Sequence, residues 1–549
     1  MTERSTALRL LALALAVLTL AAPAAAQDEA GRSAANIKAH VTFLASDLLL
    51  GREPGEPGYD IAANYVASQF AQLGLTPAGG DGSYFQKVPL YAFRNADQGQ
   101  FSLKARDGSV TPLVFGEDVL PGRPLGAPEL QVSAPMVFVG FGVVAPEAGR
   151  DDYKGLNVKG KIVVALAGAP ATFQTERRAY YAGGRVKRAE AAKRGAVGFV
   201  SVYLPGDERR QPFARAARGW QAWSMSWTAP DGTPFNPIQG APVLATLSVA
   251  GAAKLFAGAK VSYDEVAASA EGPKADPPRF VLPGTFQAAV KLESRTVMSA
   301  NVAGLIPGSD PKLKNELIVL TAHLDHIGVE TSGEGDRINN GALDNAGGIA
   351  TTLEVARAFM AAKPPRRSVL VLAVTAEEKG LIGSEYFARN PSVPGARMVG
   401  NVNLDMPVLT YDFTDVVAFG SERSTMGAAV QRAAKRLGIA LSPDPMPEEG
   451  LFTRSDHFRF VEAGVPSMFL LTGFQNGGEA KFRGFLAGCY HRPCDDLSQP
   501  IDWAAGARFA RINYEIAREL ADDDVTPAWI PGDFFGVKFG PAAPAATQR

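Results

Sequence analysis

The sequence predicts an α/β fold, a mostly parallel mixed sheet flanked by helices, with a second, β-rich region inserted into it. Two observations carry this prediction. After Ser294, short apolar runs typical of buried strands alternate with segments whose apolar residues recur at helical spacing. Such alternation favours a parallel sheet covered on both faces. Between about Gly126 and Pro283 the character of the sequence changes, and Pro-rich segments border that region on both sides.

Length and composition set the class of protein. With 549 residues the chain is too long for one ordinary core, so we expect two domains. A hydrophobic content of 46% and a charged content of 20% describe a soluble globular protein rather than a disordered one. The formal net charge of −1 gives no reason to expect a nucleic-acid partner.

Residues 1–26 have the pattern of a signal peptide. Arg4 and Arg9 precede an apolar run from Leu10 to Leu20, and an Ala-rich segment with an Ala-x-Ala site follows. We expect cleavage after Ala26 and export, to a periplasm or to the outside of the cell. The alternative is an uncleaved anchor, for which the apolar run is short. No later stretch is long enough to cross a membrane, so no anchor is expected after cleavage.

Residues 27–125 are expected to form the first part of the main domain. Apolar residues recur at helical spacing from Ala35 to Leu50 and again from about Tyr59 to Leu73. Between these two helices the segment Gly51-Arg52-Glu53-Pro54-Gly55 breaks the pattern. His40 lies within the first helix, where a structural role is expected.

Residues 126–283 are expected to form the inserted domain. Three strand-like runs and one helical segment lie in it: Met136–Val143, Lys161–Leu166 and Val197–Val202, and Arg185–Arg194. The region contains no His and no metal-ligand spacing. Trp220, Trp223 and Trp227 cluster in a loop flanked by Gly and Pro, where core packing and a lid facing the substrate are the two interpretations.

Residues 284–526 are expected to complete the main domain, and a Pro/Ala-rich tail without periodicity occupies residues 527–549. Four runs have the character of buried strands: Glu316–Ala322, Ser368–Thr375, Met398–Leu404 and Val465–Leu471. Four segments have helical spacing: Ala346–Ala361, Leu381–Arg389, Thr425–Leu437 and Trp503–Leu520.

Polar residues gather just beyond the C-terminal ends of these strands, where open α/β sheets place their ligands. The first strand leads into His323-Leu-Asp325-His326, in which Asp325 can accept the second ring N–H of His323. The second leads into Glu377-Glu378, whose side chains leave an extended backbone in opposite directions. One carboxylate can therefore bind a metal while the other faces a water molecule. A solvated turn is the alternative for this pair.

Three further residues extend the set. Asp344 lies in a Gly-rich loop before a helix, where helix N-capping is the alternative to metal binding. Asp405 follows a strand, and His491 lies between Cys489 and Cys494. Two His and three or four carboxylates suit borderline and hard divalent cations. The number of ligands is sufficient for two metals that share one carboxylate.

In order along the chain, these motifs resemble those of the co-catalytic zinc exopeptidases. That family includes secreted bacterial leucyl aminopeptidases, glutamate carboxypeptidase II, glutaminyl cyclase and the transferrin receptor. The region 126–283, with Phe138-Val-Gly-Phe-Gly-Val-Val and Val158-Lys-Gly-Lys-Ile-Val-Val, resembles a protease-associated domain. The motifs are His323-x-Asp325, Gly341-Ala-x-Asp344-Asn-x-Gly-Gly348, Glu377-Glu378, Asn403-Leu-Asp405 and Tyr490-His491.

The resemblance implies a set of metal ligands for two zinc ions. Asp344 would bridge the ions, and the peptide bond after it is often cis in the family. His323 and Asp405 would complete one site, and Glu378 and His491 would complete the other.

The resemblance also implies roles outside the ligand set. Glu377 would be the general base that takes a proton from a zinc-polarised water, and Asp325 would be the partner of His323. Ser455-Asp456-His457 matches a recurring segment, for which a helix start with a buried His is the favoured account.

The resemblance implies an exported zinc aminopeptidase acting on peptides. A carboxypeptidase would need cationic groups to hold a terminal carboxylate, and the segment after Asp405 has no Arg or Lys before Arg423. Arg454, Arg483 and Arg492 are distant in sequence but can fold inward. A glutaminyl cyclase-type acyltransferase and a non-catalytic receptor are the remaining alternatives. The oligomeric state is not predicted.

The two cysteines of the chain, Cys489 and Cys494, can pair in an oxidising compartment. Their disulfide would close a small loop around His491 and restrict where that side chain points. Thiolate binding of zinc is the alternative, although the nitrogen and oxygen ligands already complete the set.

Overall fold

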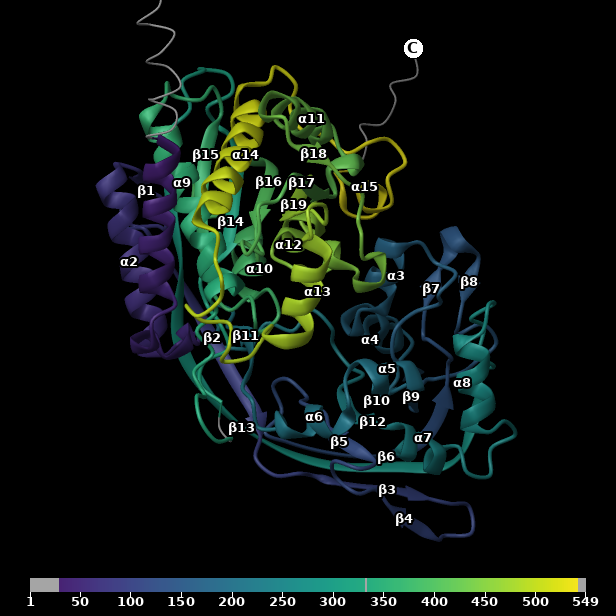
Figure 1. Ribbon diagram of the computed structural model, residues 1–549. Helices are drawn as coiled ribbons and strands as arrows, with labels where there is room; N and C mark the ends of the chain where they lie inside the picture. Colours follow the sequence, from purple (N-terminus) through teal and green to yellow (C-terminus); the bar gives the residue numbers. More distant parts are fainter. Residues whose placement is uncertain (1–28, 331–332, 542–549) are drawn as a thin grey trace, which may run out of the picture. The chain divides into compact units, whose positions relative to one another are not determined.

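The computed structural model describes residues 29–330 and 333–541 (Figure 1). The predicted signal peptide over residues 1–26 lies outside the described residues. The chain divides into two compact units. The first unit comprises the chain up to Val88, Ser299–Pro445 and the chain from Ser455 onward, and the second unit comprises Pro89–Met298 and Met446–Arg454.

The first unit is built on a mixed sheet with the strand order β18-β17-β19-β16-β14-β15-β13-β1. The four central strands are parallel, and β17 and β13 join them in the antiparallel direction. The predicted mostly parallel mixed sheet is therefore confirmed. The strands are β1 (Thr76–Pro77), β13 (Phe280–Ile306), β14 (Glu316–His323), β15 (Ser368–Val374), β16 (Arg397–Leu404), β17 (Asp415–Phe419), β18 (Ala440–Leu441) and β19 (Ser467–Thr472).

The central strands are buried on both faces, as continuous apolar runs predict. All seven residues of β15 are buried. In β14, Leu317 and Val319 belong to the core cluster that contains Phe387 of α10 and Phe460 of α12. Ile318 lies between them in sequence and therefore points to the opposite face, toward α11.

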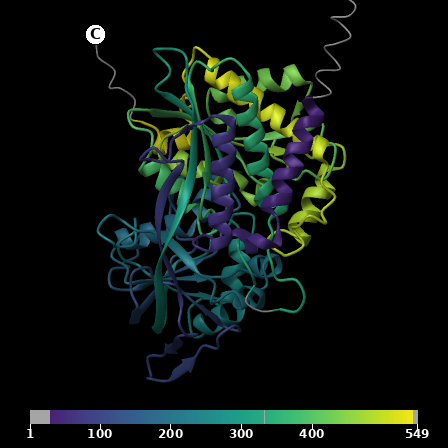
Figure 2. The same cartoon turned by 90° about the vertical axis from the view of Figure 1, so that its left-hand side faces the viewer.

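Helices cover both faces of this sheet. Figure 2 shows the N-terminal helix, residues 29–44, in purple on the side of the unit where α14 (yellow) also lies. Asn36 of that helix donates a hydrogen bond to Glu354 of α9. The other helices of the unit are α2 (Pro57–Leu73), α9 (Gly347–Ala361), α10 (Ile382–Arg389), α11 (Met426–Leu437), α12 (His457–Glu462), α13 (Gly478–Gly488), α14 (Trp503–Asp522) and α15 (Phe534–Phe539).

Three features of the first unit differ from the sequence prediction. The short strand β17 and the helix α13 were not predicted, because neither shows a clear period in the sequence. The described part of the tail is a packed part of the unit: the Trp529 indole N–H donates to Gly464 O at 2.9 Å, and Phe535 in α15 is fully buried.

The second unit contains its own mixed sheet, in the order β4-β3-β13-β6-β9-β10-β12-β5. Strands β6, β9, β10 and β12 run parallel. The main segment of this unit runs from Pro89 to Met298, so it is longer at both ends than the 126–283 segment expected from the Pro-rich borders. Its other strands are β3 (Gln100–Lys104), β4 (Val110–Pro112), β5 (Val119–Pro121), β6 (Glu129–Phe138), β9 (Ile162–Leu166), β10 (Gly198–Val202) and β12 (Val243–Leu247).

The three tryptophans of the second unit have different neighbours. Trp227 stacks on Phe235 at a ring distance of 4.1 Å, and Trp220 meets Phe115 edge-on at 5.6 Å. The Arg94 guanidinium lies 4.4 Å from the Trp223 ring centre. Each of these contacts is a packing contact within the unit. Within the described residues of the chain, we find no helix with the length and apolar character needed to span a membrane.

Candidate active site

The candidate site lies at the C-terminal ends of three neighbouring parallel strands. His323 is the last residue of β14 and pairs in register with Val374, the last residue of β15. Glu377 and Glu378 follow β15 after two residues, and Asp405 follows β16 directly. Because the strand ends are level, the residues that follow them meet at one edge of the sheet.

Asp344 reaches the same place from the loop before α9. Residue 346 occupies the N-cap of that helix, and the Asp344 side chain makes no capping hydrogen bond. The capping interpretation is therefore wrong for Asp344. Asn345 has this role in part, because its side-chain oxygen accepts a hydrogen bond from the Gly348 N–H at 3.0 Å. The peptide bond between Asp344 and Asn345 is cis.

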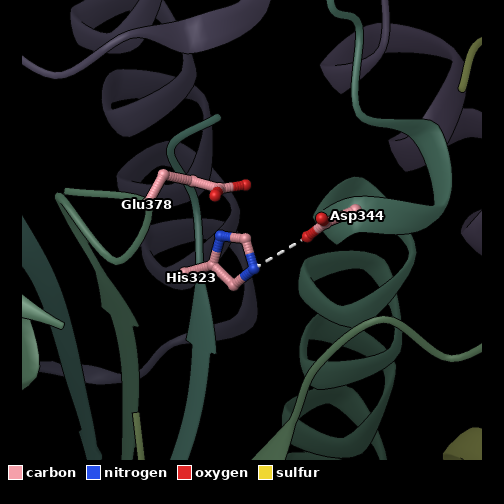
Figure 3. A group of neighbouring side chains, drawn as sticks. All are labelled: His323, Asp344 and Glu378. Carbon is pink, nitrogen blue, oxygen red and sulfur yellow. Dashed lines mark ion pairs between the residues drawn. The ribbon is translucent and has the colours of Figure 1, made fainter. Parts of the chain in front are cut away.

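Asp344 and four other side chains form a cluster of five. One Asp344 oxygen lies 3.1 Å from His323 Nε2, and the other lies 3.2 Å from His491 Nε2. His323 Nε2 is also 3.0 Å from an Asp405 oxygen, and His491 Nε2 is 3.1 Å from a Glu378 oxygen. Figure 3 shows His323, Asp344 and Glu378 pointing toward one another from three different segments.

These distances fit metal coordination. Two ligands at 2.0–2.1 Å from a tetrahedral zinc ion lie about 3.3 Å apart. In each of the four His–carboxylate pairs of this cluster, the imidazole nitrogen lies 3.0–3.2 Å from a carboxylate oxygen. His323, Asp344 and Glu378 also form a group whose ligand atoms all lie within 4.8 Å of one another. The residues present therefore fit a divalent cation with nitrogen and oxygen ligands.

Without a bound metal ion, the opposite charges of the imidazoles and carboxylates hold these side chains together. Burial opposes protonation of His491, but the carboxylates of Glu378 and Asp344 outweigh it and raise the pKa of His491 to about 10. Burial and the Asp344 carboxylate act to raise the pKa of Glu378, but His491 and His326 lower it to about 2. Burial also opposes protonation of His323, whose pKa the Asp405 and Glu377 carboxylates nevertheless raise well above its usual value. The surrounding carboxylates therefore favour the protonated form of both imidazoles when no cation is present.

We expect zinc binding to strengthen as the pH rises. Zinc binds the neutral imidazole, so binding at neutral pH must displace the proton of His491. Displacing one proton makes the apparent affinity rise ~tenfold per pH unit below the pKa, and a second proton, from His323, makes it steeper. Competition titrations with a chelator at about pH 6, 7 and 8 measure this. An apparent affinity that stays constant over that range would contradict the proton displacement.

The predicted contact between the Asp325 carboxylate and His323 is wrong in detail. His323 Nδ1 lies 3.1 Å from the main-chain oxygen of Asp325. The Asp325 carboxylate instead accepts hydrogen bonds from the backbone N–H groups of Glu377 at 3.0 Å and Glu378 at 3.3 Å. The residue still orients His323, through its peptide carbonyl, while its side chain positions the two glutamates.

The Glu377 side chain is not part of the five-residue cluster. Its carboxyl group is enclosed by protein although part of the residue is exposed, and burial raises its pKa well above the usual range. His323 opposes this rise. A bound cation would oppose it in the same way, because opposite charge favours the carboxylate.

Sequence reasoning did not assign three residues that support the ligands. His326 Nδ1 lies 2.7 Å from the Glu378 oxygen that does not face His491. The Asp495 carboxylate accepts hydrogen bonds from the backbone N–H groups of Leu343 at 2.9 Å and Asp344 at 3.0 Å. Ser455 Oγ lies 2.5 Å from the second Asp405 oxygen. His326 lies one residue beyond a predicted motif and could have been found there, whereas Asp495 carries no sequence signal.

The remaining predicted residues have these surroundings. Cys489 and Cys494 form a disulfide with a Cα–Cα distance of 5.2 Å, and His491 between them has a positive φ of 55°. The Tyr490 ring stacks on the His491 ring at 3.8 Å. His457 begins α12 and stacks on Phe469 at 5.4 Å, as a buried His at a helix start.

Comparison with known proteins gives a family match for one region of the chain. Residues 301–517 match Peptidase family M28. The chain carries a peptidase family M28 domain. The matched region contains the whole motif series that resembles the co-catalytic zinc exopeptidases.

Two curated relatives are similar to part of this chain. The chain is 31% identical to leupeptin-inactivating enzyme 1 of Streptomyces exfoliatus over 233 residues, which are 40% of this chain and 48% of the relative. It is 27% identical to aminopeptidase YwaD of Bacillus subtilis (strain 168) over 217 residues, which are 38% of this chain and 43% of the relative. The chain thus spans about half the length of these relatives.

The structure of an aminopeptidase from Aneurinibacillus sp. strain AM-1 has the same fold. It covers 91% of this chain and 96% of its own, with a TM-score of 0.51 and 21% identity. At this identity the similarity concerns the fold alone.

Proposed function

We propose that this M28 protein is an exported, zinc-dependent aminopeptidase that removes N-terminal residues from peptides. The observation that carries the proposal is the position of Asp344. Each of its two oxygens lies beside a different His, and each of these His lies beside its own second carboxylate. Two sites that share one carboxylate are the arrangement that a two-metal hydrolase needs.

The proposed ligands are divided between two zinc ions. His323 and Asp405 would hold one ion, Glu378 and His491 the other, and Asp344 both. Zinc held by these residues would supply polarisation of the substrate carbonyl and of a water molecule.

Glu377 is the proposed proton carrier. It lies beside the ligand Glu378, with its backbone held by Asp325, and it makes no ion pair within the described part of the chain. As a carboxylate it takes a proton from the attacking water, and as an acid it passes that proton to the leaving amine. The enclosed position of its carboxyl group favours both roles, because burial raises the pKa of Glu377 and makes its neutral form more accessible.

The choice of the N-terminal end rests on charge. A carboxypeptidase needs cationic groups free to hold a terminal carboxylate. Arg454 forms an ion pair with Glu449 at 3.0 Å, and Arg483 forms one with Glu479 at 2.9 Å. Arg454 and Arg483 are therefore engaged, whereas Arg492, next to His491, forms no ion pair within the described residues. The carboxylates around the site favour a substrate ammonium group. The names of several relatives, including aminopeptidase YwaD, support the same choice.

Export and the role of the second unit complete the proposal. The N-terminal sequence pattern and the Cys489–Cys494 disulfide both support an oxidising compartment, periplasmic or extracellular. The second unit is proposed to be a protease-associated domain that limits substrate size.

A comparison of three forms of one peptide tests the proposed specificity. The free peptide and its C-amidated form should be cleaved at similar rates by the zinc-loaded protein, and the N-acetylated form should resist cleavage. The reason is that only acetylation removes the ammonium group that the carboxylates attract. Cleavage that survives acetylation but is lost on amidation would reverse the assignment to a carboxypeptidase. Zinc binding without any cleavage would favour a non-catalytic binding protein.

A further inference from the structure

A buried arginine outside the family match lies beside the candidate site. Arg52 follows the N-terminal helix in the segment that breaks the helical pattern, and it is only 1% exposed. The segment Leu50–Glu53 is called the arginine loop below. Leu50, Gly51 and Arg52 all have positive φ angles, of 47°, 67° and 49°.

The Arg52 guanidinium donates hydrogen bonds to four main-chain carbonyl groups. Its Nε donates to Leu324 O at 2.9 Å, and one Nη donates to Gly341 O at 3.1 Å. The other Nη donates to Leu44 O and to Asn340 O. Leu324 lies between His323 and Asp325, and Gly341 lies three residues before Asp344. One planar group thus joins the segments that carry two of the proposed zinc ligands.

The backbone of the arginine loop adds further connections to the same segments. The main-chain oxygen of Arg52 accepts from the His326 N–H at 3.2 Å, and that of Gly51 accepts from the Gly328 N–H at 3.1 Å. A side chain at Gly51 would lie 2.5 Å from Asn339 O, so the close approach requires glycine there.

The next residue of the loop reaches the third ligand segment. Glu53 forms an ion pair with Lys379 at 2.7 Å, and Lys379 directly follows Glu378. The arginine loop therefore contacts the segments after β14 and β15 and the segment before α9. These are the segments that deliver His323, Glu378 and Asp344.

The charge of Arg52 is also placed toward the site. Within the described residues, no carboxylate lies in ion-pair distance of its guanidinium, whose hydrogen bonds go to carbonyl groups. Burial lowers the pKa of Arg52 to about 10, and the carboxylates of Asp495, Asp325 and Asp344 oppose this. The group stays charged at neutral pH and attracts carboxylates that would otherwise repel one another.

We propose that Arg52 is a positioning residue that holds the zinc-ligand segments in their binding geometry before zinc arrives. The proposal rests on the proposed function for its zinc affinity, but the positioning itself concerns the metal-free protein. Arg52 lies outside residues 301–517, so the M28 match alone does not include it.

The test compares Arg52→Lys with Arg367→Lys. Arg367 is the matched control, because it is also fully buried in the first unit and donates to the main-chain oxygen of Leu520 at 3.1 Å. It lies at the other end of the strands, where it pairs with Glu316 at 2.7 Å. Lysine keeps the charge in both variants but cannot reproduce the planar fork.

Three measurements are made on each folded variant. Hydrogen exchange of the metal-free proteins should increase over residues 323–328 and 339–345 in Arg52→Lys, and should stay at the wild-type level there in Arg367→Lys. The zinc affinity, measured by competition with a chelator, should fall ~10–100-fold in Arg52→Lys only, as for other residues that orient ligands from outside the ligand set. The absorption spectrum of the cobalt-loaded protein should shift in Arg52→Lys, because the ligand geometry changes.

The outcomes separate this proposal from the proposed function. Wild-type exchange in Arg52→Lys over both segments would overturn the positioning role, and so would equal increases in the two variants. A wild-type protein that binds no zinc would refute the proposed function, while the exchange data would still decide the role of Arg52. If Arg52→Lys does not fold, Glu53→Gln, which breaks only the Lys379 contact, should increase exchange over residues 377–380, and an unchanged exchange there would overturn the role of the loop.

Discussion

Replacing Glu377 by Gln should reduce peptide hydrolysis ~10²–10⁴-fold while both of the proposed zinc ions stay bound. The substitution removes the proton acceptor and keeps the size of the side chain. It leaves the five-residue cluster that contains Asp344 unchanged, because Glu377 takes part in none of the four His–carboxylate pairs of that cluster. The backbone N–H of residue 377 can still donate to Asp325, so the turn should keep its position.

The measurements are kcat at saturating substrate and the zinc content of the purified protein. Glu129→Gln, on the exposed start of β6, is the control for loss of one carboxylate. A zinc-loaded Glu377→Gln variant that hydrolyses peptides at a rate near that of the wild type would show that another group carries the proton. A variant without zinc would show instead that Glu377 is a ligand.

Replacing Asp344 by Asn should abolish stable binding of both zinc ions. Each Asp344 oxygen faces one of the two His ligands, so the substitution weakens both sites at once. We expect the zinc affinity to fall by more than the ~10–100-fold that is typical for residues outside the ligand set. Hydrolysis should be lost together with the metal, unlike in Glu377→Gln, where only hydrolysis is lost.

The measurement is zinc content after dialysis against a buffer of fixed free zinc concentration. Asp81→Asn is the control, since Asp81 lies exposed in a turn with a positive φ of 50°, a conformation that Asn tolerates. Full zinc occupancy in Asp344→Asn would overturn the bridging assignment. Loss of one zinc ion only would assign Asp344 to a single site.

Much of the fold could be predicted from local pattern. Strands β14 and β15 are buried on both faces, so most of their residues are apolar and the runs are visible without alignment. Strand β17 is short and pairs at the side of the sheet, and a five-residue segment carries too few residues to show a period. The borders of the second unit were also missed, because β13 continues through the predicted border at Pro283 as one strand.

The candidate ligands could be predicted from the sequence because each follows a strand end or lies in a short motif. Parallel strands carry the residues after them to one edge, so order along the chain translates into proximity. The contacts that these ligands make were harder to predict. Asp325 and His323 are two residues apart, and local geometry allowed a side-chain contact between them. The fold instead brings the Glu377–Glu378 turn over the Asp325 carboxylate, and the two backbone N–H groups occupy it.

By itself the sequence determined the α/β class, the polar residues that follow successive strands and the chemical type of the site. These follow from residue types and from the local spacing of apolar residues. Only the tertiary structure decided which groups support the ligands. Asp495 and Arg52 lie far along the chain from Asp344, yet one holds the Asp344 backbone N–H and the other the Gly341 carbonyl. No periodic pattern or residue spacing in the sequence predicts either contact. Such contacts arise because buried backbone groups near the site need partners, and folding supplies them from whichever segment packs there.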